Sequence, residues 1–315
     1  MSSRDAGLGG DPGGLRSASS AAGGEPEGRQ RRGRIEWGSG RYFDLAEAPL
    51  VMGIINCTPD SFYSESRSTD IDEALGLARR MIAQGADILD VGGESTRPGS
   101  DPVDPEEERR RAVPLIAAIR RESSILISID TRKASVARAA LDAGADIVND
   151  VSGLSDDPDC ARLVAERGAP VVLMHRRGDS KTMQNDPHYD DTLGEIEEEL
   201  EAAVEHAVAA GIRREQIILD PGIGFGKRLC DNLLILQGIA RLRALGFPLL
   251  IGLSRKSFIG KLLGGLPAEE RLIGTVVANT YAACAGADIV RVHDVAEAVA
   301  MKRILNAIAG ASQER

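Results

Sequence analysis

The stretch Gln216-Ile-Ile-Leu-Asp-Pro-Gly-Ile-Gly-Phe-Gly-Lys227 combines a short apolar run, a carboxylate and three glycines. The run predicts a buried strand that ends at Asp220, and a helical pattern begins near Leu229. A carboxylate at the end of a strand, followed by glycines, suits close approach of the backbone to a ligand. The carboxylate can accept two parallel hydrogen bonds from an N–H beside an NH2 group, an edge that guanine, pterin and arginine share. An Asp that merely begins a tight strand-to-helix turn is the alternative, and this stretch alone leaves both open.

Length and composition restrict the class of protein. The chain has 315 residues, which fits one α/β barrel of about 250 residues with extensions, or two smaller domains. The net charge of -10 and the pI of about 5.1 argue against nucleic acid as a partner. We expect neither a membrane partner nor export, because no apolar run is long enough to cross a bilayer and the N-terminus lacks an apolar signal core. The cysteines lack CxxC spacing, which predicts reduced thiols in a cytoplasmic protein: Cys57, Cys160, Cys230 and Cys284.

The N-terminal part of the chain differs in composition from the rest. Residues 1–33 are rich in Gly, Ser, Ala and Arg and hold almost no large apolar side chains, so we expect a disordered tail. Arg34–Trp37 and Tyr42–Leu45, joined through Gly38-Ser-Gly40, predict a short hairpin within residues 34–48. We expect a single domain over residues 49–310.

From Pro49 onward, short apolar runs alternate with amphipathic helical segments. The predicted strands are Leu50–Asn56, Ile88–Val91, Ile125–Asp130, Ile147–Asp150, Val171–His175, Ile217–Asp220, Leu249–Leu253 and Ile289–His293. The predicted helices are Ile71–Gln84, Glu106–Arg121, Ser135–Ala143, Cys160–Arg167, Leu193–Ala210, Leu229–Leu245, Glu269–Cys284 and Ala296–Ala309. Gly-Ala-Asp recurs at three helix-to-strand junctions, where glycine is the expected helix cap. Eight such units predict a (β/α)8 TIM barrel; a doubly wound open sheet is the alternative, although it would not require eight regular units.

In such a barrel the functional face lies at the C-terminal ends of the strands. All eight predicted strands end in or lead into polar residues. Unpaired polar groups in an interior cost stability, so a shared site explains this coincidence better than eight separate structural roles. The polar ends are Asn56–Phe62, Gly92–Gly99, Asp130–Arg132, Asn149–Asp150, Met174–Gly178, Asp220–Lys227, Ser254–Ser257 and Arg291–His293.

These polar groups sort by charge. Asp130, Asn149 and Asp220 offer acceptors that suit a flat heterocycle with a donor-rich edge. Positive charge or hydrogen-bond donors come from Arg97, Arg255, Lys256, Arg291 and His293.

Closure of the barrel would place its first and last strands side by side. Asn56 would then lie near Arg291 and His293, which predicts an anion site with a neutral oxygen available for a metal. The structural alternatives are an ion pair of Arg291 with Asp294 or Asp288, and a core hydrogen bond for His293.

Several of these strings together resemble the dihydropteroate synthase family of folate biosynthesis. The resemblance rests on Met52–Phe62, Asp90–Gly99, Asp220–Lys227, Ser254–Ser257 and Arg291–Val295, and it covers about residues 50–309 in the family's order. It implies that the amino nitrogen of 4-aminobenzoate attacks 6-hydroxymethyl-7,8-dihydropterin pyrophosphate. Pyrophosphate departs first, a pterin cation forms, and 7,8-dihydropteroate results.

The resemblance also implies roles for individual residues. The pterin would contact Asp130, Asn149, Met174, Asp220, Phe225 and Lys256. The pyrophosphate would contact Asn56, Thr96, Arg291 and His293, with Mg2+ as cofactor held by Asn56. The 4-aminobenzoate pocket, where sulfonamides compete, would be bordered by Arg97, Pro98 and Ser257. No general base is implied; catalysis would be electrostatic, through Asn56, Arg97, Lys256, Arg291 and His293. The resemblance suggests a homodimer formed through the late helices, with small molecules as the other partners.

One segment departs from the family's pattern. The family's first loop commonly continues Ser-Asp-Gly-Gly, whereas Phe62 is followed here by Tyr63-Ser-Glu-Ser66. Two rivals remain: a methyltransferase barrel that uses a methylated folate, and a non-catalytic paralogue that binds a pterin or a partner. A methyltransferase would not need Asn56, Arg291, His293 or the Ser254–Ser257 segment, and the altered loop is the only support for the paralogue. Pyrophosphate release that depends on 4-aminobenzoate would separate all three.

Overall fold

The computed structural model describes residues 33–37, 41–45, 49–57, 67–95 and 99–311, and these residues belong to one compact unit. Among the predictions that lie outside the described residues are the disordered tail, apart from Gly33, and the altered first loop at residues 63–66.

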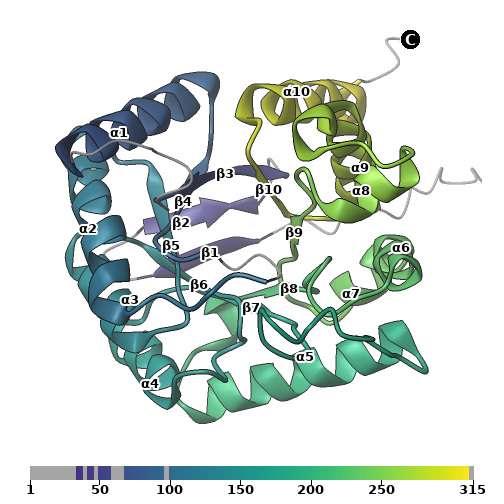
Figure 1. The fold of residues 1–315 in the computed structure, drawn as a ribbon, viewed down its shortest axis with the longest axis horizontal. Helices are drawn as coiled ribbons and strands as arrows, with labels where there is room; N and C mark the ends of the chain where they lie inside the picture. The colour runs from purple at the N-terminus through teal and green to yellow at the C-terminus, as the bar shows by residue number, and fades with distance from the viewer. Residues whose placement is uncertain (1–32, 38–40, 46–48, 58–66, 96–98, 312–315) are drawn as a thin grey trace, which may run out of the picture. The chain divides into compact units, whose positions relative to one another are not determined.

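Eight parallel strands form the predicted (β/α)8 barrel (Figure 1). They are β3 (Leu50–Asn56), β4 (Ile88–Gly92), β5 (Leu126–Asp130), β6 (Ile147–Asp150), β7 (Val171–Met174), β8 (Ile217–Asp220), β9 (Leu250–Gly252) and β10 (Ile289–Val292). The hydrogen-bonded order is β8-β7-β6-β5-β4-β3-β10-β9. A parallel bridge between Leu219 and Leu249 brings the two edges of this sheet together. The doubly wound alternative is therefore wrong.

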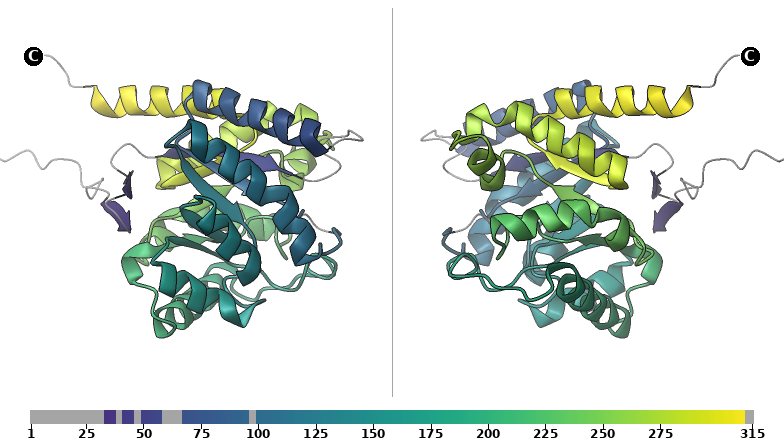
Figure 2. Two further views of the ribbon diagram at one scale, coloured as in Figure 1. Left: turned by 90° about the vertical axis from the view of Figure 1, so that its left-hand side faces the viewer. Right: turned by 90° about the vertical axis from the view of Figure 1, so that its right-hand side faces the viewer.

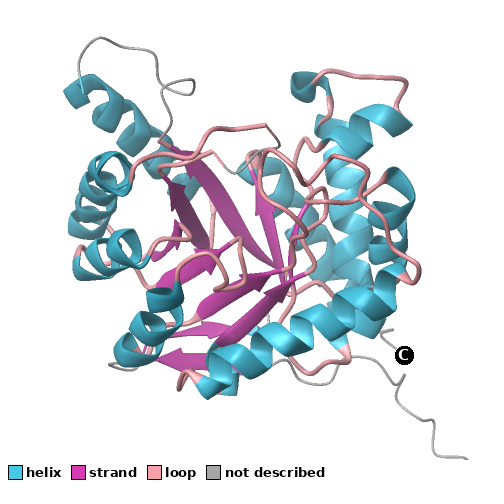
Figure 3. Cartoon of the chain, turned by 60° about the horizontal axis from the view of Figure 1, so that its bottom comes forward, coloured by secondary structure: helices cyan, strands magenta, loops and turns pink. Residues whose placement is uncertain are grey.

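Helices surround the strands (Figure 3). They are α1 (Arg67–Gln84), α2 (Pro105–Glu122), α3 (Ala134–Asp142), α4 (Pro158–Arg167), α5 (Thr192–Ala209), α6 (Leu229–Gln237), α7 (Ile239–Arg243), α8 (Ser257–Leu262), α9 (Leu272–Ala285) and α10 (Val295–Gly310). The glycines of the three Gly-Ala-Asp junctions all have positive φ, between 98° and 117°, as a helix cap requires: Gly85, Gly144 and Gly286.

The N-terminal hairpin closes one end of the barrel. Strands β1 (Arg34–Trp37) and β2 (Arg41–Asp44) pair antiparallel, as predicted. Ile35 and Phe43 of this pair are buried in one cluster with the inward apolar side chains of the barrel strands. Several of these begin their strands, such as Leu50 and Ile289, so the hairpin covers the N-terminal end (Figure 2). The opposite end, where the strands finish, is left for a site.

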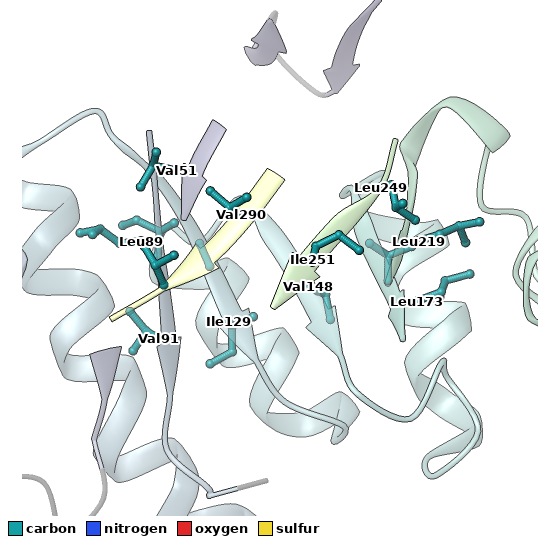
Figure 4. Close-up of a cluster of buried hydrophobic side chains, with 14 of the residues drawn as sticks. Val51, Leu89, Val91, Ile129, Val148, Leu173, Leu219, Leu249, Ile251 and Val290 are labelled. Atoms are coloured by element: carbon teal, nitrogen blue, oxygen red, sulfur yellow. The ribbon is translucent and has the colours of Figure 1, made fainter. Parts of the chain in front are cut away.

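A second, larger apolar cluster lies between the strands and the helices. The outward residues of the strands alternate with the inward ones and supply its inner wall, including Val51, Leu89, Ile129 and Val290 (Figure 4). Because the strands are buried on both faces, their sequences read as nearly continuous apolar runs. This explains why the strand bounds were predictable to within about one residue.

Two helical predictions differ from the structure. The predicted helix Leu229–Leu245 is divided into α6 and α7 at Gly238, where a Cβ would lie 2.5 Å from a methyl carbon of Leu193 on α5. The two helices are therefore divided at a position where a side chain of α5 comes close. Helix α8 was not predicted, because its six residues are too few to show a helical period. Among the described residues, no helix is both long and apolar enough to cross a membrane.

Candidate active site

The candidate site lies at the C-terminal ends of the strands, on their inward face. Side chains two residues apart on a strand face the same side. Asp90, Asn149, Asp220 and Arg291 each follow an inward apolar residue of the closed end by two positions. Met174 and Asp130 hold equivalent inward positions, following Val172 and Leu126. Along each of these strands, the inward side chain therefore changes from apolar to polar, in most cases charged, towards the C-terminal end. The predicted pterin residues on the strands are brought together in this layer.

Arg291 connects two of the carboxylates in this layer. Its Nε donates to Asp90 Oδ2 at 2.6 Å and its Nη2 donates to Asp130 Oδ2 at 2.7 Å. Asn149 Nδ2 donates to the same Asp90 oxygen at 3.1 Å. The other carboxylate oxygens of Asp90 and Asp130 are buried and accept no hydrogen bond. Burial raises the pKa of Asp130 to about 8, although Arg291 opposes this shift. Buried acceptors without donors are costly, so this layer suits a ligand rich in N–H groups.

Neither structural alternative for Arg291 is found. Asp294 is paired with Arg255, whose Nε lies 3.0 Å from Oδ2, and Asp288 is paired with Arg243. Arg255 was grouped with the residues that offer positive charge or donors. In the structure its guanidinium is paired with Asp294.

Asp220 and Lys256 form the second charged part of the site. Asp220 is buried, its Oδ1 accepts from Gly222 N at 2.8 Å, and burial raises its pKa while Lys256 opposes this. Burial lowers the pKa of Lys256 to about 8, and Asp220 opposes that shift in turn. The Lys256 ammonium lies 4.8 Å from the ring centroid of half-buried Phe225 and donates to Ile223 O. An aromatic face, a cation and a carboxylate are thus adjacent, as the predicted pterin contacts require.

The segment Asp220–Lys227, here called the glycine loop, is held from several sides. Asn232 Oδ1 accepts from Gly224 N at 2.7 Å, and Gln184 Nε2 donates to Gly224 O at 2.7 Å. Tyr189 Oη donates to Gly226 O at 2.9 Å. Gly222 has φ 65°, and a Cβ there would overlap the carbonyl oxygen of His175. The glycines therefore serve a close approach of two backbones as well as a turn.

We expect Gly222→Ala to lower the free energy of unfolding by roughly 3 kcal/mol, because it adds an overlap to left-handed strain. Gly246→Ala is the matched control: Gly246 also has positive φ, 87°, but a Cβ there meets nothing within 4 Å. The control should lose only about 1 kcal/mol. Urea denaturation of both variants tests this, and equal losses would mean that the contact with His175 carries no cost.

Asn56 and His293 end neighbouring strands, because β3 pairs with β10 in the register Gly53↔Val292. His293 Nδ1 lies 3.0 Å from Ser254 Oγ, so the predicted core hydrogen bond exists and can orient the ring. Asn56 is half-buried. Ser257 is exposed at the first position of α8.

Three predicted site residues lie outside the described part of the chain, namely Thr96, Arg97 and Pro98. Sequence reasoning missed others. Asp90 was quoted only within a motif, although it contacts both Arg291 and Asn149. Its position two residues after Ile88 on β4 is the signal that could have identified it. Lys227 and His175 were quoted without a role, and they turn out to contact each other.

Comparison with known proteins assigns the class. A family model described as pterin binding enzyme matches residues 52–293. The dihydropteroate synthase of Synechocystis sp. is 47% identical over 266 residues, which covers 84% of this chain and 92% of the relative. The chain belongs to the pterin-binding enzymes.

Solved structures narrow the class further. The Yersinia pestis dihydropteroate synthase, solved with a sulfonamide drug complex, is 42% identical with a TM-score of 0.83, covering 88% of this chain and 100% of that one. The Xanthomonas albilineans enzyme with 4-aminobenzoic acid is 42% identical with a TM-score of 0.82, covering 89% and 99%. The same enzyme with 7,8-dihydropteroate has a TM-score of 0.80 at 40% identity, covering 89% and 100%. Within the pterin-binding enzymes, this chain belongs to the dihydropteroate synthases, which are transferases of folate biosynthesis.

Proposed function

We propose that the side chains at the C-terminal ends of the barrel strands catalyse the condensation of 6-hydroxymethyl-7,8-dihydropterin pyrophosphate with 4-aminobenzoate. The products are 7,8-dihydropteroate and pyrophosphate. The observation that carries this proposal is the inward acceptor set of Asp130, Asn149 and Asp220 beside the Lys256 cation. A pterin offers an N–H beside an NH2 group, which a carboxylate can accept in parallel.

The pterin end of the substrate fits the buried carboxylates. The unpaired oxygen of Asp130 and the carboxylate of Asp220 are acceptors, and the Asn149 side chain can both accept and donate. Lys256 donates and Phe225 offers a ring face, while Met174 adds an apolar contact. Together these groups orient the ring so that its hydroxymethyl carbon faces the first and last strands.

The leaving group fits the side of the barrel formed by β3 and β10. Loss of pyrophosphate leaves a cation conjugated with the pterin ring, so the chain's task is to stabilise separating charges. Arg291 and His293 offer donors to the pyrophosphate, and the carboxylate of Asp90, which bonds Arg291, is available to stabilise positive charge. The aromatic amine is a neutral nucleophile that needs no strong base, so positioning and charge suffice.

Mg2+ is proposed as a companion of the pyrophosphate. No group of three His, Cys, Asp or Glu residues within the described ranges could hold a metal ion alone. This fits Mg2+, which usually keeps several waters and takes ligands from substrate phosphates and from few protein oxygens. The amide oxygen of half-buried Asn56 is the proposed protein ligand. When bound, the ion would neutralise charge on the leaving group.

The proposed 4-aminobenzoate pocket is bordered by Ser257, which is exposed at the start of α8, together with Arg97 and Pro98. Relatives solved with 4-aminobenzoic acid and with a sulfonamide support this choice of ligand class.

Release of pyrophosphate, measured with and without 4-aminobenzoate, tests the function. We expect release that requires both substrates and Mg2+, with 7,8-dihydropteroate formed in equal amount. A methyltransferase would release none, and a non-catalytic binder would take up the pterin without turnover.

The proposed homodimer rests on an apolar surface of the late helices. Ile273, Val277 and Tyr281 recur every four residues on α9 and are exposed by 79%, 64% and 50%. Ile304 and Ile308 on α10 are also exposed, and the two helices lie side by side (Figure 1). Apolar residues grouped in this way favour an isologous contact with a second copy.

We expect Val277→Glu to convert the dimer to a monomer, because it places a charge in the centre of the proposed interface. Sedimentation velocity measures the change. Val208→Glu on α5 is the control, since Val208 is exposed on a different helix and should leave the mass unchanged. A wild-type protein that is already monomeric at micromolar concentration would contradict the proposed interface.

A cytoplasmic location is proposed from the thiols. All four cysteines are free in the structure, and Cys160 is buried. Unpaired thiols are typical of a reducing compartment.

A further inference from the structure

A buried hydrogen-bonded chain lies behind the glycine loop. Lys227 Nζ lies 2.9 Å from His175 Nδ1, and His175 Nε2 lies 2.9 Å from Glu199 Oε2. Lys227 and His175 are only 3% and 4% exposed, whereas Glu199 on α5 reaches solvent. Lys227 lies in the loop after β8, His175 follows β7 and Glu199 is on α5. These hydrogen bonds therefore join the glycine loop to two neighbouring elements.

The proton positions in this chain follow from its ends. A carboxylate can only accept, so His175 Nε2 must carry the proton that is donated to Glu199. His175 Nδ1 is then an acceptor, and the Lys227 ammonium donates to it. Burial lowers the pKa of His175 to about 4, with Lys227 adding to the effect, so the imidazole is neutral at pH 7. Any positive charge within this set of three residues is therefore carried by Lys227 and not by His175.

Lys227 acts on the glycine loop in two ways. Its ammonium donates to Phe225 O at 3.0 Å, which fixes the backbone that carries the Phe225 ring. It also interacts electrostatically with Asp220, because Lys227 lowers the pKa of the Asp220 carboxyl against the effect of burial. Burial lowers the pKa of Lys227 itself to about 7, and Asp220 opposes that shift. Lys256 and Arg291 are the other cations that act on Asp220. Arg177, which stacks on Tyr189 and bonds both Glu199 and Glu195, adds further charge beside these residues.

We propose that Lys227, held by His175 and Glu199, is a positioning residue that fixes the glycine loop, and with it Phe225 and Asp220, in the arrangement that binds the pterin. The inference rests on the proposed role of Asp220 in pterin binding. Lys227 itself touches no reacting atom in this assignment, since its ammonium is directed at His175 and backbone carbonyls. Its effect reaches the substrate through the charge and the geometry of the loop.

Lys227→Met tests the proposal, because Met keeps the length and removes the charge. We expect the Kd of 6-hydroxymethyl-7,8-dihydropterin pyrophosphate to rise about tenfold, because the loop loses the charged donor to Phe225 O and the carboxyl of Asp220 loses a nearby cation. The KM for 4-aminobenzoate should stay within about twofold of the wild type. Pterin affinity should fall as the pH falls through the pKa of Asp220, and we call this part of the affinity-against-pH curve the acid limb. Because removal of a nearby cation raises the pKa of a carboxyl, the acid limb should move to higher pH in the variant.

Lys302→Met is the matched control. Lys302 is also largely buried and pairs with Asp87 at 2.9 Å, at the opposite end of β4 from the site. It should lose stability without a change in pterin affinity or in the acid limb. If Lys227→Met does not fold, Glu199→Gln tests the proposal instead, because it removes the carboxylate at the exposed end of the Lys227–His175–Glu199 set. Glu199→Gln should also raise the Kd of the pterin pyrophosphate.

The outcomes separate the inference from the proposed function. Unchanged pterin affinity and an unmoved acid limb in the variants would overturn the role of Lys227 while Asp220→Asn still abolishes binding. The same loss of affinity in Lys302→Met would also overturn it, since general destabilisation would then explain the result. Pterin affinity that survives Asp220→Asn would instead overturn the proposed function.

Discussion

Asp220→Asn should abolish measurable pterin binding while leaving the fold intact. The amide replaces one acceptor oxygen with an NH2 donor that faces the donors of the pterin edge. Loss of a charge-assisted parallel pair, with a buried donor left unsatisfied, costs about 3 kcal/mol or more, which is at least a hundredfold in Kd. Isothermal titration calorimetry with the pterin pyrophosphate measures this directly.

The fold should survive because Asn keeps the volume and its Oδ1 can still accept from Gly222 N. The folded pKa of Asp220 is raised above its unfolded value, so its ionisation costs stability as the pH rises through the folded pKa. Asn removes that cost, and the melting temperature at pH 7 should not fall. Asp142→Asn is the control, since Asp142 is exposed on α3 and pairs only with Arg167 in the described structure. Wild-type pterin affinity in Asp220→Asn would refute the assignment of this carboxylate.

The local chemistry of the strands made most of the fold predictable. Apolar runs buried on both faces identified all eight barrel strands, and Gly85, Gly144 and Gly286 marked helix ends because only a residue tolerant of positive φ fits there. The break at Gly238 was not predictable in this way. Its cause is the approach of Leu193, a residue from another helix, which leaves no trace in the local pattern.

The site was predictable in composition but not in pairing. Polar strand ends identified Asp130, Asn149 and Asp220, because period-two alternation is local. The partners of Arg291 lie 201 and 161 residues away, so only the register of the closed barrel selects Asp90 and Asp130 over the nearby Asp294. Lys227 and His175 are likewise 52 residues apart. Pairings set by closure need the three-dimensional structure.

Arg291→Met should lower both stability and turnover, for two separable reasons. The guanidinium bonds both Asp90 and Asp130. Removing one partner of a buried ion pair typically costs about 3–5 kcal/mol, and we expect the free energy of unfolding to fall by about this much. The same guanidinium is the proposed donor to the departing pyrophosphate. Loss of a donor aimed at developing negative charge lowers kcat by roughly 10²–10³-fold.

The stability deficit should depend on pH in a defined direction. The folded pKa of Asp130 is raised to about 8 by burial, and Arg291 opposes that rise. A carboxyl with a raised folded pKa contributes stability that is lost as the pH rises through that pKa. Without Arg291 the folded pKa goes higher still, so the additional loss appears above about pH 8. Denaturant unfolding at pH 6 and pH 9 should therefore show a larger deficit for Arg291→Met at pH 9.

Arg243→Met separates the two effects. Arg243 also pairs with a fully buried carboxylate, Asp288, at 2.6 Å, but Asp288 precedes β10 at the closed end of the barrel. This control should lose stability without losing turnover per folded molecule. Arg291→Lys retains the charge but not the fork that reaches two carboxylates at once, so it should fall between wild type and Arg291→Met in both measurements. If Arg291→Met and Arg243→Met retained equal turnover at a temperature where both are folded, Arg291 would be structural only, and the leaving-group site would have to lie elsewhere than beside β10.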